Sequence, residues 1–223
     1  ECIGSGIAHR QNQFRTNLIQ DGHKFYLGYY LGGIKQEVWA FKNREKNSVE
    51  RWINKALDVC DSLPEIDVVV RALGHAELDA SANSTSLDML GARLAASIGA
   101  EYRPDCLYKN SSLAKSTMCS AKERAQQVHG VYSSTPGLQT SQNKSVSTFL
   151  IVDDVLTSGA TTGDIVRALS ESYPKARVFI FTLVKTLYRA ECVRESAEAQ
   201  HNAQLFSDLY SKTQRLPETP AIN

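Results

Sequence analysis

One apolar segment, which ends in two adjacent carboxylates and a short turn, constrains the fold of this chain more than any other. Residues 149–161 read FLIVDDVLTSGAT. The apolar residues before the acids are typical of a strand buried in a parallel sheet. Ligands of open α/β sheets bind at the carboxyl ends of such strands. The segment therefore predicts a parallel sheet with acidic groups and a phosphate-sized turn at its ligand-binding edge.

The segments around this turn form a βαβ unit. We expect a strand over 148–152, a helix over 161–172 and a second apolar strand over 178–184. Pro174 ends the helix, because proline cannot continue it. A crossover connection of this kind is expected to be right-handed.

Two amphipathic helices and a short strand are predicted upstream. The first helix begins near Val49, with Asn47 or Ser48 as its cap, and its apolar face includes Cys60. A β-branched strand follows over 66–70, and a second helix over 87–98. The polar segment 1–24 is weakly ordered or a short hairpin, while 109–120 and 133–147 read as loops. A capping box at Ser120 and Glu123 predicts a further helix start.

Length and charge narrow the classes of function. A chain of 223 residues suits one domain, or one domain with a small appendage, and its 42% hydrophobic content is enough for a normal core. A formal net charge of +1 provides no electrostatic footprint for nucleic acid or for an anionic membrane surface, although a local basic patch is not excluded.

The cysteines are scattered and show neither zinc-like nor redox spacing, which favours reduced thiols in a cytoplasmic protein. No apolar stretch approaches the roughly 20 residues that span a bilayer. The sequence begins at Glu1 without a methionine and without a signal-peptide pattern, and we expect residues to precede it. The five cysteines are Cys2, Cys60, Cys106, Cys119 and Cys192.

Segment 149–161 resembles the motif with which type I phosphoribosyltransferases bind 5-phosphoribosyl-1-pyrophosphate (PRPP). The resemblance implies that the carboxylates of Asp153 and Asp154 accept charge-assisted hydrogen bonds from the vicinal hydroxyls of the ribose. Adjacent side chains diverge along a strand, so we expect the backbone to turn at the strand end and to direct both acids to the ligand. The alternative is an ordinary strand followed by a turn and a helix cap.

The turn after the acids would hold the 5′-phosphate of such a ligand. Its N–H groups lie where a helix begins, and a helix N-terminus favours an anion. Gly159 lets the backbone approach the phosphate closely. The residues assigned to this role are Thr157, Ser158, Gly159, Ala160 and Thr161.

The resemblance also implies a loop that holds the pyrophosphate after an early strand. In this role Arg71 would pair with pyrophosphate oxygens, and Gly74 would let the backbone turn. An exposed arginine after a strand is the competing interpretation, and His75 is interpreted as a loop residue. The loop comprises Arg71, Ala72, Leu73 and Gly74.

A flexible loop that closes over the ligand and supplies cations is a further feature implied by the resemblance. Closure would exclude water from a hydrolysable intermediate. For any single lysine here, a solvated charged loop is the more common explanation. The cations in the matching region are Lys109, Lys115, Lys122 and Arg124.

A looser pattern over roughly residues 26–190 is similar to the ComF group, the phosphoribosyltransferase-like proteins linked to natural competence. It consists of Tyr30, Ile34, Val38, Phe41 and Lys42 before the early strand, Lys109, Glu123, Arg124, Gly130, Val131 and Tyr132 after it, and then the acidic segment. The chain departs from that group in two ways. It has Cys2 in place of an N-terminal cysteine cluster, and the segment 71–74 in place of a proline-rich first loop.

The fold implied is a three-layer α/β domain with a mostly parallel sheet, a small N-terminal hood and a C-terminal helix. The expected divisions are a hood over 1–64, a phosphoribosyltransferase-like core over 65–190, and a helix and tail over 191–223. In the hood, aromatic side chains offer either stacking surfaces for an acceptor or simply hood core: Tyr26, Tyr29, Tyr30 and Trp39.

The function implied is Mg²⁺-assisted transfer of a 5-phosphoribosyl group from PRPP to a nitrogen nucleophile, or the reverse reaction. The Mg²⁺ would be held through PRPP, with Asp153 as a further ligand, and not by a protein cage. Two alternatives stay open: a regulator that binds PRPP or a nucleotide without turnover, and a ComF-like protein that binds a partner in DNA uptake or phage defence. A homodimer is the default of the family.

Overall fold

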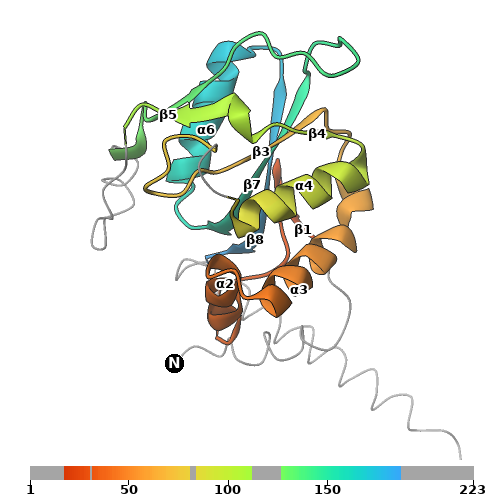
Figure 1. Ribbon diagram of the computed structural model, residues 1–223, viewed down its shortest axis with the longest axis vertical. Coiled ribbons are helices and arrows are strands. Elements are labelled where there is room, and N and C mark those ends of the chain that lie inside the picture. Colours follow the sequence, from red (N-terminus) through yellow and green to blue (C-terminus); the bar gives the residue numbers. More distant parts are fainter. Residues whose placement is uncertain (1–17, 31, 81–83, 112–126, 187–223) are drawn as a thin grey trace, which may run out of the picture.

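The computed structural model describes residues 18–30, 32–80, 84–111 and 127–186 (Figure 1). Strands and helices alternate in the units β3-α4-β4 and β7-α6-β8, and short 3₁₀ turns lie at Cys60–Ser62 and Pro104–Cys106. In chain order the elements are β1 (Ile19–Asp21), β2 (Lys24–Tyr26), α2 (Ile34–Lys42), α3 (Lys46–Leu57), β3 (Val68–Arg71), α4 (Ser86–Ile98), β4 (Glu101–Tyr102), β5 (Leu107–Lys109), β6 (Tyr132–Ser134), β7 (Thr148–Leu156), α6 (Ala160–Ser172) and β8 (Arg177–Lys185).

The central sheet has the strand order β1-β2-β8-β7-β3-β4. Each neighbouring pair is parallel except β1 with β2, which form an antiparallel hairpin. The two long strands β7 and β8 lie in the middle of the sheet, where both of their faces are covered, as their continuous apolar sequences require. The predicted α/β class with a mostly parallel sheet is confirmed.

Two hydrophobic cores lie on opposite faces of this sheet, because successive residues of a strand point to opposite sides. Leu150 and Val152 of β7 pack in the core that contains the apolar faces of α3 and α4. Phe149 and Ile151 pack in the core that contains Ile165 of α6. The result is three layers, with α2, α3 and α4 on one face of the sheet and α6 on the other (Figure 1).

The segment before residue 65 is not only a hood. A hairpin, one of the two expectations for residues 1–24, is present over 19–26, and it adds β1 and β2 to the edge of the main sheet beside β8. Phe25 and Tyr26 are buried there, and the hairpin pairs the edge that β8 would otherwise expose. The helices α2 and α3 of the same segment pack on the face of the sheet instead. The division of the chain at residues 64 and 190 stays a prediction.

The predicted end of helix α4 is correct, whereas the predicted start of helix α3 is wrong. Helix α4 has a capping box between Thr85 and Asp88 and ends at Gly99, whose φ of 71° is the left-handed conformation that glycine favours. Helix α3 begins at Lys46, before the predicted start. Ser48 is therefore inside the helix, and its hydroxyl donates to the Glu37 carbonyl oxygen at 2.9 Å instead of capping. Cys60 is buried, as expected.

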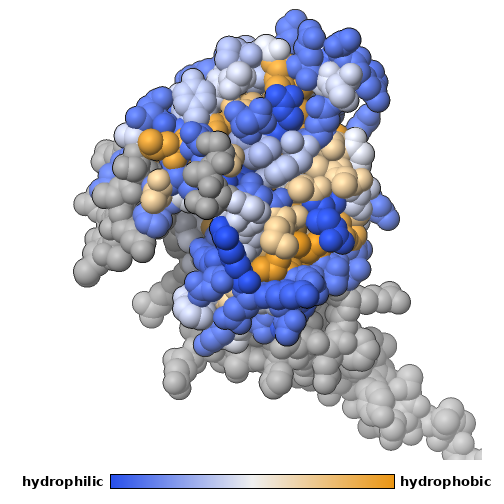
Figure 2. Space-filling view, in the orientation of Figure 1, coloured by the Kyte–Doolittle hydropathy of each residue, from blue (hydrophilic) through white to orange (hydrophobic). Residues whose placement is uncertain are grey.

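Hydrophilic residues dominate the face drawn in Figure 2, and hydrophobic residues show between α3 and α4. Among the described helices, none is long and apolar enough to cross a membrane. The predicted C-terminal helix and the capping box at Ser120 lie outside the described residues.

Candidate ligand-binding site

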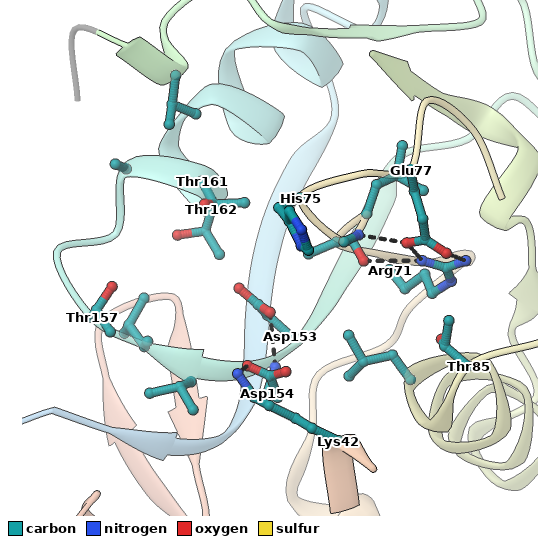
Figure 3. Close-up of a pocket in the computed structure, with 18 of the residues that line it drawn as sticks. Lys42, Arg71, His75, Glu77, Thr85, Asp153, Asp154, Thr157, Thr161 and Thr162 are labelled. Carbon is teal, nitrogen blue, oxygen red and sulfur yellow. Dashed lines mark hydrogen bonds and ion pairs between the residues drawn. The ribbon is translucent and has the colours of Figure 1, made fainter. Parts of the chain in front are cut away.

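A cavity of ≈ 690 Å³ lies at the carboxyl ends of β3 and β7 (Figure 3). Because β3 and β7 are parallel, the segments that follow them meet at one edge of the sheet. Four segments supply most of the cavity lining, namely the end of α2 (41–43), the loop after β3 (71–77), the start of α4 (85–87) and the acidic segment with the turn after it (153–162). Lys109, Gln127, Val128 and Tyr132 complete it. Three of the four segments contain residues that the sequence singled out.

The two aspartates lie within β7 and not after it, because β7 continues to Leu156 in register with Lys185 of β8. The expected turn at the acids is therefore wrong, and alternation along the strand sends the two side chains to opposite faces. Both still reach the cavity, since β3 ends at Arg71, opposite Val152, and leaves the rest of β7 uncovered on that side.

Each aspartate has a defined neighbour. Lys42 Nζ, at the end of α2, lies 3.0 Å from Asp154 Oδ1. The Asp154 N–H donates to Asp153 Oδ1 at 2.8 Å. Figure 3 shows Lys42 reaching Asp154 from the helix side, with Asp153 lying nearer to His75.

The turn after the acids has the form of an anion site. Gly159 has a φ of 76° and precedes α6, which begins at Ala160. The hydroxyl of Thr162 donates to the Gly159 carbonyl oxygen at 3.2 Å. The first N–H groups of α6 have no intrahelical acceptor, as at the start of any helix, and this turn lines the cavity. The geometry suits a phosphate group.

Arg71 differs from its predicted role. Its side chain is 1% exposed, and its Nη1 lies 2.8 Å from Glu77 Oε2 while its Nε lies 2.5 Å from Asp88 Oδ1. The guanidinium therefore holds two carboxylates of the protein, at a position that also lines the cavity (Figure 3). Glu77 also accepts the Gly74 N–H, at 2.5 Å. His75 is exposed in the loop, as predicted.

These contacts determine the ionisation of Glu77, Asp88 and Arg71. Burial by itself would raise the pKa of Glu77, but hydrogen bonds from Arg71 and from the Gly74 N–H outweigh it and hold the pKa below its ordinary value. The pKa of Asp88 is lowered in the same way, against burial, by Tyr102, Arg71 and Thr85. Although burial opposes it, the two carboxylates raise the pKa of Arg71. All three groups are charged at neutral pH.

Lys109 is not part of a flexible loop. It is the last residue of β5 and is 5% exposed. Its Nζ donates to the carbonyl oxygens of Leu73 at 3.2 Å and Gly74 at 2.5 Å. Burial lowers the pKa of Lys109 to about 8, against the attraction of Glu77. The other predicted cations of that loop, Lys115, Lys122 and Arg124, lie outside the described residues.

Several residues of the site were not assigned a role from the sequence. Lys42 and Tyr132 entered only as members of a loose pattern, and nothing local marked them as neighbours of the aspartates. Glu77 offered one signal, a carboxylate six residues after an arginine across a glycine turn. The cavity-lining residues that the sequence analysis left without a role include Lys42, Glu77, Thr85, Tyr132 and Thr162.

Within the described ranges, no group of three histidine, cysteine or acidic side chains is placed to hold a metal ion. The carboxylates of Asp153 and Asp154 are hard oxygen donors at the cavity, and Mg²⁺ binds through one or two carboxylates together with waters and ligand phosphates. The residues present therefore fit a Mg²⁺ ion that arrives with a phosphorylated ligand.

No protein-family model and no curated protein matches this chain. Several solved structures have a similar fold. An adenine phosphoribosyltransferase from Trypanosoma brucei is 11% identical, with a TM-score of 0.42, over 80% of this chain and 91% of that one. The adenine phosphoribosyltransferase from Saccharomyces cerevisiae is 16% identical, with a TM-score of 0.38, over 66% and 72%. A xanthine-guanine-hypoxanthine phosphoribosyltransferase from Helicobacter pylori is 8% identical, with a TM-score of 0.39, over 69% and 96%.

Proposed function

We propose that this protein binds PRPP at the carboxyl edge of β7 and transfers its 5-phosphoribosyl group to a nitrogen nucleophile. The observation that carries the proposal is the shared cavity of two adjacent carboxylates, Asp153 and Asp154, and the N-terminus of α6 that follows them. Carboxylates are acceptors for ribose hydroxyls, and a helix start is a donor for phosphate. The order of the two along one segment matches the order of hydroxyls and 5′-phosphate on a phosphorylated ribose.

In the proposed reaction the bond from C1 of the ribose to a pyrophosphate oxygen breaks, and a bond from C1 to the acceptor nitrogen forms. Pyrophosphate leaves with the electron pair, and the acceptor loses its proton. The transition state resembles an oxocarbenium ion. The chain would act by positioning, with the aspartates on the ribose hydroxyls and the turn 157–161 on the 5′-phosphate.

Mg²⁺ would be held by Asp153 together with oxygens of the ligand. When bound, the ion would neutralise charge on the leaving pyrophosphate. The pyrophosphate itself would meet the loop at Ala72, Leu73 and Gly74, which lines the cavity. Arg71 lines the cavity as well, but Glu77 and Asp88 engage its guanidinium, so its role on the pyrophosphate stays a prediction.

Isothermal titration with PRPP and Mg²⁺ tests the proposal. The wild-type protein should bind, and the Asp153→Asn/Asp154→Asn variant should lose binding while it keeps its circular dichroism spectrum. The matched control is Asp58→Asn/Asp61→Asn, which removes two exposed carboxylates outside the cavity. Binding that persists in the site variant, or that disappears equally in the control, would refute the site. A screen of nitrogenous bases for pyrophosphate release then tests transfer.

A regulator that binds PRPP or a nucleotide without turnover is the second candidate. The ion pairs of Arg71 with Glu77 and Asp88 favour it, because they engage the guanidinium that would otherwise stabilise a leaving pyrophosphate. PRPP binding without pyrophosphate release for any base would select this candidate over the enzyme. The ComF-like role and a homodimer stay predictions from the sequence.

A further inference from the structure

Lys109 makes contacts that bear on the shape of the loop after β3. It belongs to β5, which pairs with β6 apart from the main sheet. Its ammonium donates to the carbonyl oxygens of both Leu73 and Gly74. The ring of Tyr132 lies 5.2 Å from the same nitrogen, and the Tyr132 hydroxyl donates to the Leu73 oxygen at 3.0 Å.

Because peptide bonds are planar, contacts that fix the carbonyl groups of the loop also fix the direction of its N–H groups. In a trans peptide the N–H points opposite to the carbonyl of the preceding residue, and the described part of the chain has no cis bond. With the Leu73 and Gly74 carbonyls held by Lys109, the N–H groups of Gly74 and His75 face away from it. Glu77 accepts the first of these at 2.5 Å, which holds the loop from the other side.

Such a lysine is costly to bury. Lysine is almost never fully buried unless it is paired. Among the described residues no carboxylate forms an ion pair with its ammonium, and the hydrogen-bond partners of that group are main-chain carbonyl oxygens. An apolar side chain would fill the position at lower cost. Packing alone therefore does not explain why a lysine occupies this position.

We propose that Lys109 is a positioning residue, whose ammonium fixes the loop 72–75 in the shape that receives the pyrophosphate group of the ligand. The inference rests on the proposed function. Lys109 itself lines the cavity, and the inference assigns to it the holding of the loop, in addition to any contact with the ligand. The carbonyls of Leu73 and Gly74, which would repel an anion, are held by the ammonium. The N–H groups of Ala72, Leu73 and Gly74 donate to Val152, Tyr132 and Glu77, which leaves the His75 N–H, on the side away from Lys109, to meet an anion.

The test compares Lys109→Met with the wild-type protein and with Lys109→Arg. Two ligands are titrated separately in the presence of Mg²⁺, inorganic pyrophosphate for this loop and ribose 5-phosphate for the turn at 157–161. Loss of a hydrogen bond from a charged group should weaken pyrophosphate binding about tenfold to a hundredfold in the methionine variant. Ribose 5-phosphate should bind within about twofold of wild type, because that site is separate. Lys109→Arg should recover part of the pyrophosphate affinity.

A measurement without ligand separates positioning from simple attraction of charge. Hydrogen exchange of the segment 70–78 should be faster in Lys109→Met than in wild type, because the loop has lost its anchor. The matched control is Lys55→Met, which removes a half-buried lysine of α3 that lies over Trp52 at 4.9 Å. This control should change neither the exchange of that segment nor pyrophosphate binding.

The outcomes are distinct. If the wild-type protein binds neither ligand, the proposed function fails and this inference falls with it. If wild type binds both and Lys109→Met binds pyrophosphate equally well, or exchanges at the wild-type rate in 70–78, only the role of Lys109 is refuted. Should the methionine variant not fold, Lys109→Gln provides the same comparison with a neutral donor in place of the ammonium.

Discussion

Replacing Glu77 with glutamine tests whether the buried charge cluster holds the loop after β3. The carboxylate accepts from Arg71 Nη1 at 2.8 Å, from Arg71 Nη2 at 3.0 Å and from the Gly74 N–H. An amide retains one acceptor oxygen, but its NH₂ group then faces a guanidinium donor. Arg71 is fully buried and keeps Asp88 as its partner. The variant therefore weakens the pairing of the Arg71 charge but does not leave that charge unpaired.

The expected loss follows from these contacts. A hydrogen bond to a charged group contributes about 1.5–3 kcal/mol, and breaking a buried pair outright costs about 3–5 kcal/mol. Because Asp88 remains, we expect the Glu77→Gln variant to lose about 2–3 kcal/mol of unfolding free energy at pH 7. Urea unfolding followed by circular dichroism would show this as a midpoint about 1 M lower.

At acid pH the difference in unfolding free energy between the wild-type protein and the Glu77→Gln variant should disappear. The folded-state pKa of Glu77 lies below its ordinary value of 4.5, so its contribution is present above that pH and is lost as the pH falls towards the lowered pKa. The matched control is Glu171→Gln, which breaks a 2.8 Å pair with Arg167 at a 65% exposed side chain. That pair should contribute less than about 1 kcal/mol. A Glu77→Gln loss no larger than the control, or one that persists unchanged at pH 3.5, would refute the reasoning.

Two further predictions concern pH and the turn before α6. Because the pKa of Lys109 is lowered to about 8 from 10.5, the unfolded chain binds more protons between these values, so the Lys109 contribution to stability should become more favourable as the pH rises from 8 to 10.5. Urea midpoints of wild type and Lys109→Met at pH 7.5 and pH 10 measure it, and a difference that does not change with pH would contradict it. Gly159→Ala should cost about 1–2 kcal/mol, since its φ of 76° is strained for a residue with a Cβ atom even though 3.8 Å separates that atom from Thr162 Oγ1. A thermal midpoint equal to that of wild type would show that the turn does not require glycine.

Apolar runs and polar interruptions were enough to predict the βαβ unit around β7 and β8. Each strand there is hydrophobic on both faces, which is a property of the residues themselves. The acidic segment was predicted as a site because it ends a buried strand. Its aspartates and the turn after it line a cavity, and their role in binding stays a prediction.

Other features depend on contacts between segments far apart in the chain. The hairpin β1–β2 joins the sheet because β8 offers it an open edge, and β7 extends through both aspartates because β8 continues beside it. Neither feature can be predicted from the local sequence, because the neighbouring strand determines where a strand ends.

The sequence by itself determined the fold class, because hydrophobic periodicity and turn chemistry act over a few residues, and it predicted that the acidic segment lies at the carboxyl edge of the sheet. Only the tertiary structure decided which charged groups face the cavity. It paired Arg71 with Glu77 and Asp88, placed Lys109 under the loop, and brought Lys42 to Asp154. A charged side chain reaches several partners of similar energy, and burial selects among them only once the layers have packed.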